Sequence, residues 1–300
     1  MGATLSSDFA FEPKVWQDHI GAYFDKKLVF GAYALVDTTL TAAPGETVNF
    51  PYFKAIGDAE EPSQSQGLQV DNLQDDSFSA TVKEVGKAVG FKKKALRKSA
   101  AQRDRIFGEA QSQLARVHAE KVDADLITEL NTSGNYVAGF VGTGTGDVAN
   151  ITNINIGRIQ GFGDKADQAV AIFMHSYHLL SLLNDSTAGF LKADAIPTQN
   201  RIDVPGWMGK LLGMDVIVTD QVPAASDISG KKAYYSFIVK RNAYGFMLAE
   251  NMDLERDYDL LHREWVIAAT QWYAVKGFHA KIASNDYRVV RNLFCTAISA

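Results

Sequence analysis

Cysteine is nearly absent from this 300-residue chain, in which Cys295 stands alone. A single cysteine cannot form a disulfide within its own chain, so the fold cannot depend on oxidation, and we expect synthesis in a reducing cytoplasm. No apolar run approaches the roughly 18 residues that a membrane-spanning helix requires. Residues 1–11 also lack the basic segment and apolar stretch of a secretion signal. With 46% hydrophobic residues, the chain is expected to fold as a soluble globular protein.

A surplus of positive charge is missing as well, because the net charge is -5 and the pI is about 5.7. This balance argues against a protein that neutralises many phosphates, since nucleic-acid binding relies on clustered Lys and Arg. Charge is nevertheless segregated along the chain. Residues 55–82 contain six acidic residues and no Lys or Arg, whereas residues 83–105 contain nine basic residues and two acidic ones. The two stretches are either solvated faces of one domain or complementary surfaces through which copies of the chain meet.

Signatures of nucleotide binding and of metal binding are also lacking. The piece Gly142-Thr-Gly-Thr-Gly146 lacks the third glycine of the dinucleotide fingerprint, and no helical pattern follows it, so we interpret it as a turn. His175 and His178 are close enough to share a helix face, but no further ligand at metal-binding spacing joins them. We expect one of these histidines to be packed and the other exposed.

No pair of carboxylates is placed for acid–base chemistry. Asp123 and Asp125 fall on different faces of an expected helix and are expected to be solvated. The same is expected of the acidic pairs in a polar loop, which are Glu60, Glu61, Asp75 and Asp76. Carboxylates with unperturbed pKa values are poor general acids, and nothing local activates Cys295. We therefore predict no catalytic residue, no cofactor and no metal site.

A long hairpin is indicated by two alternating segments. Val48, Phe50 and Tyr52 alternate with other residues after the turn signal Pro44-Gly45, and the pattern returns at residues 78–82. About 25 polar residues with few large apolar groups separate the two strands. Such a hairpin has little to bury inside its own subunit, and an isolated hairpin is only marginally stable in water. We expect it to project and to find its partner on a neighbour.

Helical periodicity extends from about residue 101 to residue 131. The apolar residues that form its stripe are Ile106, Ala110, Leu114, Val117, Val122, Leu126 and Leu130. A helix of that length spans about 45 Å at 1.5 Å per residue. A second helix is expected over residues 164–183, and a loop with a short strand over residues 137–156. Strands are expected at residues 215–219, 234–239, 265–275 and 288–294, so the fold class is α+β.

The succession of segments carries a family resemblance. An apolar arm leads into GETVNFPYFKAIGDAEEP (residues 45–62), and DDSFSATVKEVGKAVGFKKKAL (75–96) leads into the long helix. The later segments are DKADQAVAIFMHSYHLLSLLND, GKLLGMDVIVTDQVP, YYSFIVKRNAYGFMLAE and ERDYDLLHREWVIAATQWYAVKGF. In this order they resemble the extended loop, the spine helix, an axial-domain helix and strand, a core strand and the long peripheral strands of tailed-phage major capsid proteins, which have the Hong Kong-type phage capsid fold.

The resemblance implies a domain layout and a set of partners. The layout is an N-terminal arm (1–40), an extended hairpin loop (41–92), a peripheral domain with the spine helix (93–155), an axial domain (156–248) and peripheral-domain strands (249–300). The chain would self-assemble as hexamers and pentamers into an icosahedral shell. That shell would enclose double-stranded DNA without sequence-specific binding, and separate scaffolding, portal and decoration proteins would assist it. The virion would be assembled in the host cytoplasm, with no membrane involved.

Two alternatives stay open, an encapsulin-type nanocompartment shell and an α+β enzyme without a recognisable motif. For the shell, we predict contacts between subunits along the hairpin and the basic stretch. The candidate residues are Phe50, Tyr52, Asp58, Glu60, Glu61, Asp75, Asp76, Lys92, Lys93, Lys94, Arg97 and Lys98.

Overall fold

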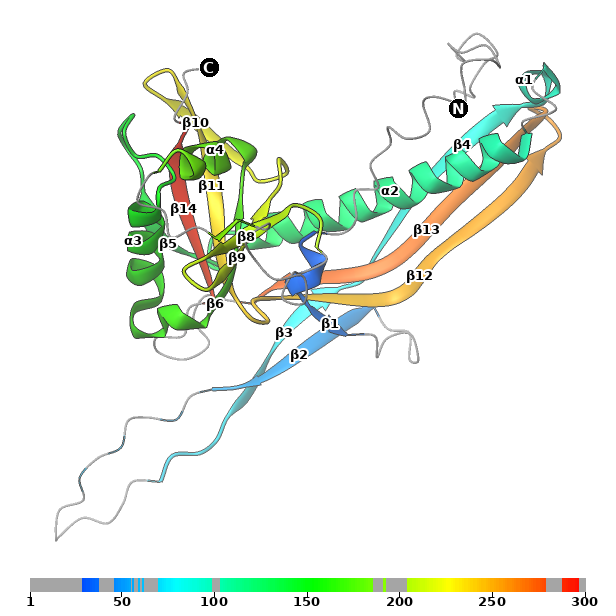
Figure 1. The fold of residues 1–300 in the computed structure, drawn as a ribbon. Helices are drawn as coiled ribbons and strands as arrows, with labels where there is room; N and C mark the ends of the chain where they lie inside the picture. The colour runs from blue at the N-terminus through cyan, green and yellow to red at the C-terminus, as the bar shows by residue number, and fades with distance from the viewer. Residues whose placement is uncertain are drawn as a thin grey trace.

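The computed structural model describes residues 29–37, 46–54, 56, 59, 61, 70–98, 103–185, 191–192, 204–278 and 288–296. Within these residues, an eight-stranded sheet with its helices forms a compact body, and a four-stranded sheet with one long helix extends from it. A two-stranded hairpin projects from the junction of these two parts (Figure 1). None of the helices in the described ranges has the length and apolar character that a membrane span requires.

The four-stranded sheet has the order β1 (Leu35–Asp37), β12 (Tyr244–Asp259), β13 (Glu264–Gly277) and β4 (Lys83–Lys92). β12, β13 and β4 are antiparallel, and the short β1 runs parallel to β12. Successive side chains of a strand point to opposite faces, so Trp265, Ile267 and Ala269 of β13 share one face. They pack with Ile106 and Leu114 of the long helix α2 (Arg103–Leu130).

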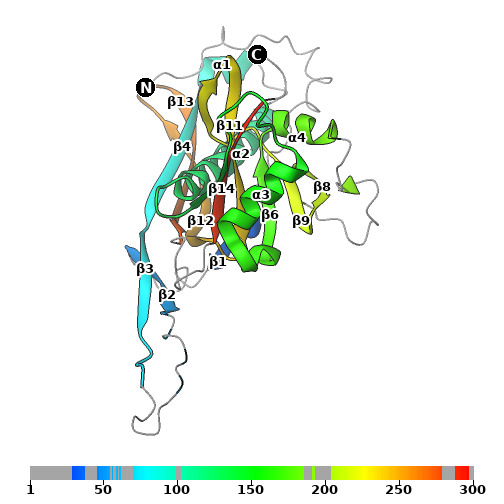
Figure 2. The same cartoon turned by 90° about the vertical axis from the view of Figure 1, so that its left-hand side faces the viewer.

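The eight-stranded sheet forms the body. Its order is β5 (Val137–Val141), β14 (Val289–Cys295), β11 (Lys231–Lys240), β6 (Ala169–Met174), β9 (Met214–Val218), β8 (Trp207–Leu211) and β7 (Leu191–Lys192), with β10 (Ala224–Ile228) beside β11. Helices α3 (Ile151–Phe162) and α4 (Ser176–Leu183) cover one face (Figure 2). The C-terminal half of α2 and Phe30 pack on the other face. The α+β prediction and all four predicted strands are confirmed.

Helix α2 joins the two parts, because its first half packs on the four-stranded sheet and its second half on the eight-stranded sheet. The predicted long helix is confirmed at 28 residues. One stripe residue is wrong, since Val117 is 40% exposed and the neighbouring His118 is buried instead. The buried face of α2 changes near this position, because its first half packs on the four-stranded sheet and its second half packs on the eight-stranded sheet.

The predicted second helix over residues 164–183 is confirmed only at its end, over Ser176–Leu183, and is wrong before that. That segment consists of a 3-10 turn (Gly163–Gln168), strand β6 and helix α4. β6 lies inside the sheet between β11 and β9, and nearly all of its side chains are buried. A short apolar run that is covered on both faces has no alternation, so a strand of this kind looks like part of a buried helix.

The short strand predicted within residues 137–156 is confirmed as β5, but the end of the predicted loop is the start of helix α3. Asn150 caps the helix by accepting a hydrogen bond from the Asn153 N–H at 2.7 Å. The helix also lies very close to β14, and a Cβ added to Gly161 would come within 2.1 Å of Val290 Cγ2. Its Asn, Thr and Gly content gives a weak helical signal, whereas the cap and the packing stabilise it.

The expectation that Asp123 and Asp125 are solvated is wrong. Asp123 is 2% exposed and accepts hydrogen bonds from the Val29 N–H at 2.8 Å and the Phe30 N–H at 3.0 Å. Burial raises the pKa of Asp123 to about 6, although these N–H groups oppose the shift. Asp123 therefore connects the segment before β1 to the second half of α2.

Asp125 has a different environment on the same helix. Burial acts to raise its pKa, but the net shift is downward because Lys83 at 2.7 Å, the Tyr273 hydroxyl and Lys121 stabilise the carboxylate. Asp125 therefore connects α2 to β4 and β13. Both aspartates have structural roles.

Candidate assembly surfaces

The base of the hairpin packs on its own chain. β2 (Thr47–Phe53) and β3 (Asp75–Thr81) pair antiparallel over seven residues each, as the alternating pattern predicted. One face of the pair is apolar, and Phe50 and Phe78 both contact Phe278 at ring-centroid distances of 5.4 Å. These rings belong to a cluster with Met247 and Ala274 of the four-stranded sheet. The expectation that the hairpin buries little inside its own subunit is therefore wrong at its base.

Beyond the paired strands, the hairpin leaves the rest of the molecule. A hydrogen bond from the Lys54 N–H to the Gln74 carbonyl continues the ladder by one step. Large apolar side chains are exposed here, whereas residues 62–69 of the expected polar tip lie outside the described residues. The exposed apolar side chains are Phe53 at 67%, Ile56 at 64%, Val70 at 86% and Leu73 at 66%. We call these four residues, with the exposed Glu61 and Asp71, the hairpin shaft.

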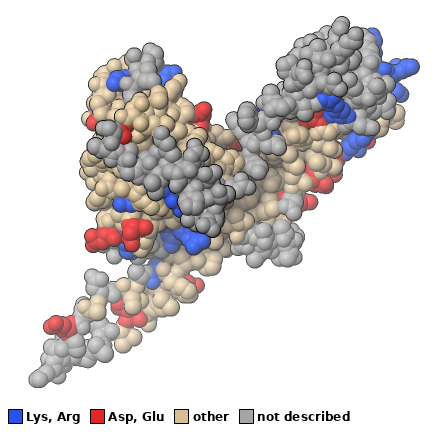
Figure 3. Space-filling view, viewed as in Figure 1, with Lys and Arg blue, Asp and Glu red and all other residues tan. Residues whose placement is uncertain are grey.

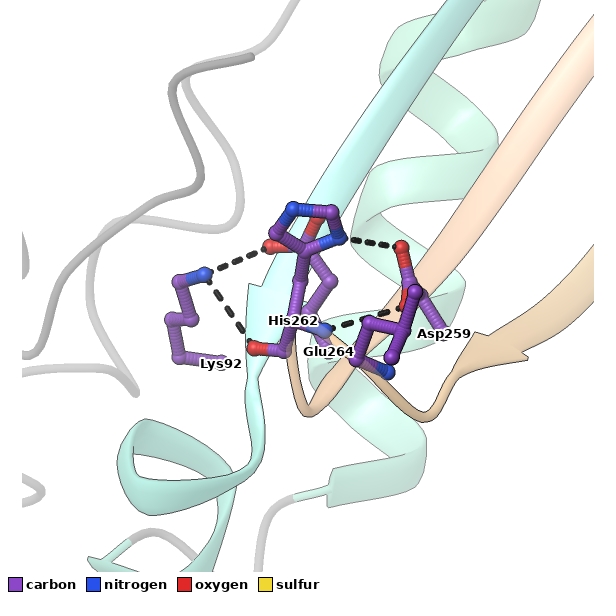
Figure 4. A network of polar contacts seen from close by, with 5 residues as sticks. Lys92, Asp259, His262 and Glu264 are labelled. Carbon is purple, nitrogen blue, oxygen red and sulfur yellow. Dashed lines mark hydrogen bonds and ion pairs between the residues drawn. The ribbon is translucent and has the colours of Figure 1, made fainter.

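At the opposite end of the molecule, the turn between β12 and β13 is held by one carboxylate. Asp259 accepts hydrogen bonds from the N–H groups of Leu261 at 2.8 Å and His262 at 3.0 Å, and it contacts the His262 ring at 2.6 Å (Figure 4). The His262 N–H, the His262 ring and the Leu261 N–H lower the pKa of Asp259. The turn thereby presents Leu260 and Leu261 to solvent, 78% and 91% exposed.

A basic hollow lies beside this turn, at the end of β4 and in helix α1 (Lys93–Lys98). It has a volume of about 1010 Å³ and is lined by Lys92, Lys93, Lys94, Arg97, Tyr258, Leu260, His262 and Arg263. Lys92 forms an ion pair with Glu264 at 3.1 Å and contacts the His262 carbonyl at 3.3 Å (Figure 4). Lys93 lies over the Tyr258 ring at 5.6 Å.

Three cations of the hollow have no acidic partner within the part of the chain that the structure describes, and Figure 3 shows Lys and Arg side chains gathered at this end of the molecule. Among the described residues, no carboxylate forms an ion pair with Lys94, Arg97 or Arg263. Arg263 also has a positive φ of 51°, a conformation that costs a non-glycine residue about 1 kcal/mol or more. We call the hollow and the leucine turn together the basic end.

One group of possible metal ligands occurs among the described residues, namely Asp259, His262 and Glu264. Their ligand atoms lie within 4.8 Å of one another. However, Asp259 and His262 already bond each other, and the carboxylate of Glu264 pairs with Lys92. A dication would have to replace these contacts amid Lys and Arg side chains. These side chains therefore stabilise the turn through their contacts with one another and with Lys92.

The predicted contact residues fall into two groups that the structure does not bring together within one chain. Lys92, Lys93, Lys94 and Arg97 lie in the basic end, whereas Tyr52, Glu61, Asp75 and Asp76 lie on the hairpin. Asp76 bonds the Ser77 N–H and pairs with Lys54 at 3.2 Å, and both contacts lower its pKa. Phe50 is buried in its own chain. Asp58, Glu60 and the side chain of Lys98 lie outside the described residues.

Sequence reasoning missed the apolar members of both surfaces. Leu260 and Leu261 stand next to each other between charged residues, a position that no core element explains. Both that pair and the isolated Val70 and Leu73, which stand among polar residues, could have indicated exposed apolar side chains. Arg263 gave no signal, because its unusual backbone is visible only in the structure.

The other sequence candidates have structural roles. In the glycine-rich turn, the N–H groups of Thr143 and Gly144 bond Asp147 at 2.9 and 2.7 Å, so the chain's own carboxylate occupies the place of an anion. A helix does follow this turn, contrary to the expectation. Cys295 is buried, and this burial raises the pKa of its thiol.

His175 and His178 are both buried, so the expectation that one of them is packed is confirmed and the expectation that the other is exposed is wrong. His175 caps α4 and stacks on Tyr234 at 3.9 Å. His178 contacts the Ser236 hydroxyl and the Phe294 carbonyl, both at 3.3 Å. Burial lowers the pKa of His178 to about 4.

Comparison with known proteins gives a consistent set of relatives. No protein-family profile matches the chain. The major capsid protein of Staphylococcus phage phiMR11 is 27% identical over 236 residues, covering 77% of this chain and 80% of that protein. The capsid of Ralstonia phage GP4 matches with a TM-score of 0.76 at 14% identity, over 100% of both chains.

Two further solved structures agree. The head structure of Helicobacter pylori bacteriophage KHP40 has a TM-score of 0.66 at 14% identity and covers 98% of this chain and 97% of its own. The cyanophage Pam1 capsid has a TM-score of 0.66 at 14% identity and covers 97% and 99%. The fold described above is therefore the phage capsid fold over essentially the whole chain.

Proposed function

We propose that this chain, which belongs to the tailed-phage major capsid proteins, builds the shell of a phage head from many copies of itself. The observation that carries the proposal is the hairpin shaft, whose apolar side chains extend into solvent away from any core of their own chain. Exposed apolar residues gathered in one place mark interaction sites. A second copy of the chain is the partner that a shell supplies.

The segmentation of the chain is part of the proposal. The four-stranded sheet with the first half of α2 would be the peripheral domain, and the eight-stranded sheet with α3 and α4 the axial domain. Sheet pairing favours grouping β5 and β14 with the axial domain, although they lie in the segments 93–155 and 249–300. The hairpin and the N-terminal arm would act between subunits.

We also propose that the role is structural and that the shell encloses double-stranded DNA without a sequence-specific site. The acidic net charge of the chain supports an inner wall that contains nucleic acid without binding it tightly. The perturbed pKa values of Asp123, Asp125 and His178 belong to buried groups that hold elements together, which supports a role without catalysis. Hexamers and pentamers assembled in the host cytoplasm would be the building units.

Electron microscopy of the purified full chain tests this function. Closed shells, or rings of five or six copies, are the expected result. A chain that stays monomeric at every concentration would contradict it. Deleting residues 58–74 should leave a folded subunit that forms no shell, because the base of the hairpin, with Phe50 and Phe78, remains on its own sheet. Normal shells from this deletion would show that the hairpin is not an element between subunits.

A further inference from the structure

Helix α4 is attached to the eight-stranded body by very few side chains. Only His178, Ser181 and Leu182 of this helix are buried, and the Ser181 hydroxyl bonds the Tyr177 carbonyl of the helix itself. Leu182 packs in the apolar cluster of the body. His178 contacts the sheet directly, at the end of the body that lies away from the hairpin (Figures 1 and 2). One of the two side chains that hold α4 with no exposed surface is therefore a histidine.

The contacts of His178 are those of a neutral imidazole. Its Nε2 lies 3.3 Å from the Phe294 carbonyl, which can only accept, so this nitrogen carries the proton. Its Nδ1 lies 3.3 Å from Ser236 Oγ and accepts the hydroxyl proton. The ring also meets Tyr234 and Phe294 edge to face, at centroid distances of 5.9 and 5.6 Å. A second proton would place a positive charge here with only a hydroxyl and a carbonyl to compensate it.

His175 precedes α4 and caps its first turn. Its Nδ1 accepts the Tyr177 N–H at 3.3 Å, so this nitrogen must be free of a proton. Its Nε2 lies 3.4 Å from Asp220, and its ring stacks on Tyr234 at a centroid distance of 3.9 Å. Protonation of Nδ1 would turn the acceptor of the cap into a second donor. The cap is therefore lost when His175 becomes charged, although Asp220 compensates part of that charge.

The titratable groups that face the two rings come from three elements. They are Tyr177 of α4, Tyr234 of β11 and Asp220 in the turn after β9, and each histidine also faces the other. Burial lowers the pKa of His178 to about 4 and also lowers the pKa of His175, where Asp220 opposes the shift. An imidazole in water has a pKa of about 6.5. Between these values, an open α4 binds protons that the closed helix excludes.

We propose that His175 and His178 form an acid-operated switch that releases α4 from the eight-stranded body. In the closed state both rings are neutral and hold the helix through the cap, the stack on Tyr234 and the contact with Phe294. In acid both rings take up a proton that water stabilises only when the helix is open. The contribution of each histidine to the closed state is complete above about pH 6.5 and is lost as the pH falls toward 4.

The release is local, because the sheet beneath α4 is held by its own ladders. β11 pairs with β14 on one side and with β6 on the other, and neither ladder involves α4. Opening uncovers Tyr234, Ser236 and Phe294 and leaves the four-stranded sheet unchanged. The inference concerns the folded subunit, so it does not depend on whether the chain forms a shell.

Hydrogen exchange of the full, unassembled chain, read by mass spectrometry, tests the switch. Between about pH 7 and about pH 4.5, after correction for the intrinsic rates, protection of residues 176–184 should fall by roughly tenfold or more. Protection of β13 should stay the same, and return to about pH 7 should restore α4. Carboxylates such as Asp185, which accepts the Ile151 N–H at 3.1 Å, are common to the parent and to each histidine variant. Differences between these chains at one pH therefore report the histidines.

His178→Gln removes the charge and keeps the contacts. Its amide can donate to the Phe294 carbonyl and accept the Ser236 hydroxyl, and it takes up no proton in this range. In this variant α4 should stay protected at about pH 4.5. His262→Gln is the matched control, because His262 is exposed in the turn between β12 and β13. It should respond to acid as the parent does.

Two further variants make the test independent of that single substitution. His175→Asn keeps a side-chain acceptor at the cap, so its α4 should respond to acid less than the parent. Asp220→Asn removes the carboxylate that favours a proton on His175, so its response should move to lower pH. The switch would be overturned by an α4 that stays protected in acid, by α4 and β13 losing protection together, or by a parent-like response of both His178→Gln and His175→Asn. If the glutamine variant is already open at about pH 7, a parent-like response of His175→Asn alone overturns it.

Discussion

The apolar side chains between the layers of the eight-stranded body are buried, whereas those of the hairpin shaft are exposed. In the body, strands such as β6 are covered on both faces, and Ile172 and Phe173 have no exposed surface. On the shaft, apolar side chains of similar size remain in solvent. The body therefore derives its stability from its own chain, whereas the shaft is stabilised by burial only when another molecule covers it. Changes in the two regions should have separable effects, on folding and on assembly.

The largest effect on folding is expected for Leu114→Ala. Leu114 is 2% exposed in the cluster between α2 and the four-stranded sheet, and deleting a buried leucine side chain costs about 2 to 5 kcal/mol. The loss should appear as a lower free energy of unfolding of the unassembled chain in urea. Val117→Ala, less than one turn away but 40% exposed, is the matched control and should cost under about 1 kcal/mol. Equal losses would mean that α2 does not pack as described.

A smaller loss is expected for Asp123→Asn. The carboxylate receives the N–H groups of Val29 and Phe30, and an amide would turn its own NH₂ group toward one of these donors. An unsatisfied buried donor costs about 1 to 3 kcal/mol. Urea unfolding should show this loss, and limited proteolysis should cut sooner near residues 29–31. Asp253→Asn, at an exposed position on β12, should change neither measurement.

The pH dependence of the free energy of unfolding should also reveal the burial of Asp123. The pKa of Asp123 is raised from 3.8 to about 6, so between these values the folded chain binds a proton that the unfolded chain has released. Its contribution to stability is therefore fully present below pH 4 and is lost as the pH rises to about 6. The Asp123→Asn variant should lack this part of the slope. Identical profiles for parent and variant between pH 4 and pH 6 would contradict the assignment to Asp123.

The sequence predicted the elements whose pattern is local. The long helix and the hairpin strands follow periods that the chain itself displays, and the α+β fold follows from their order. β6 was missed because burial on both faces removes its alternation. The anchoring of Phe50 was missed for another reason, because its partner Phe278 is more than 200 residues away in the sequence and only the folded cluster brings the two rings together.

Of the candidate surfaces, the sequence indicated the charges and missed the apolar residues. The basic run at residues 92–97 and the acidic hairpin both stand out in a linear sequence. They lie at opposite ends of the molecule because strand β4, which connects them, extends along β13, and the sequence pattern did not indicate this strand. The buried state of Asp123 depends in the same way on a segment more than 90 residues earlier in the chain.

Salt is expected to have the smallest effect on the free energy of each contact. It should nevertheless distinguish the two regions, because it weakens assembly and leaves the folding of the body nearly unchanged. Exposed ion pairs contribute about 1 kcal/mol or less each, and the Debye length falls from about 8 Å at 0.15 M salt to about 3 Å at 1 M. A shell would repeat the predicted contacts between the hairpin and the basic stretch many times, so the concentration of chain required for assembly should rise with salt. Urea unfolding of the unassembled chain should change little over the same range, because its body is held by buried apolar contacts. Light scattering against chain concentration, at several concentrations of sodium chloride, measures the concentration required for assembly.

High salt should not abolish assembly, since the exposed side chains of Leu260 and Leu261 can contribute apolar burial that salt does not screen. The variant Leu260→Ser with Leu261→Ser should therefore assemble poorly at every salt concentration. Assembly that is indifferent to salt, or a double serine variant that assembles as well as the parent, would remove the distinction between a self-sufficient body and a neighbour-dependent shaft.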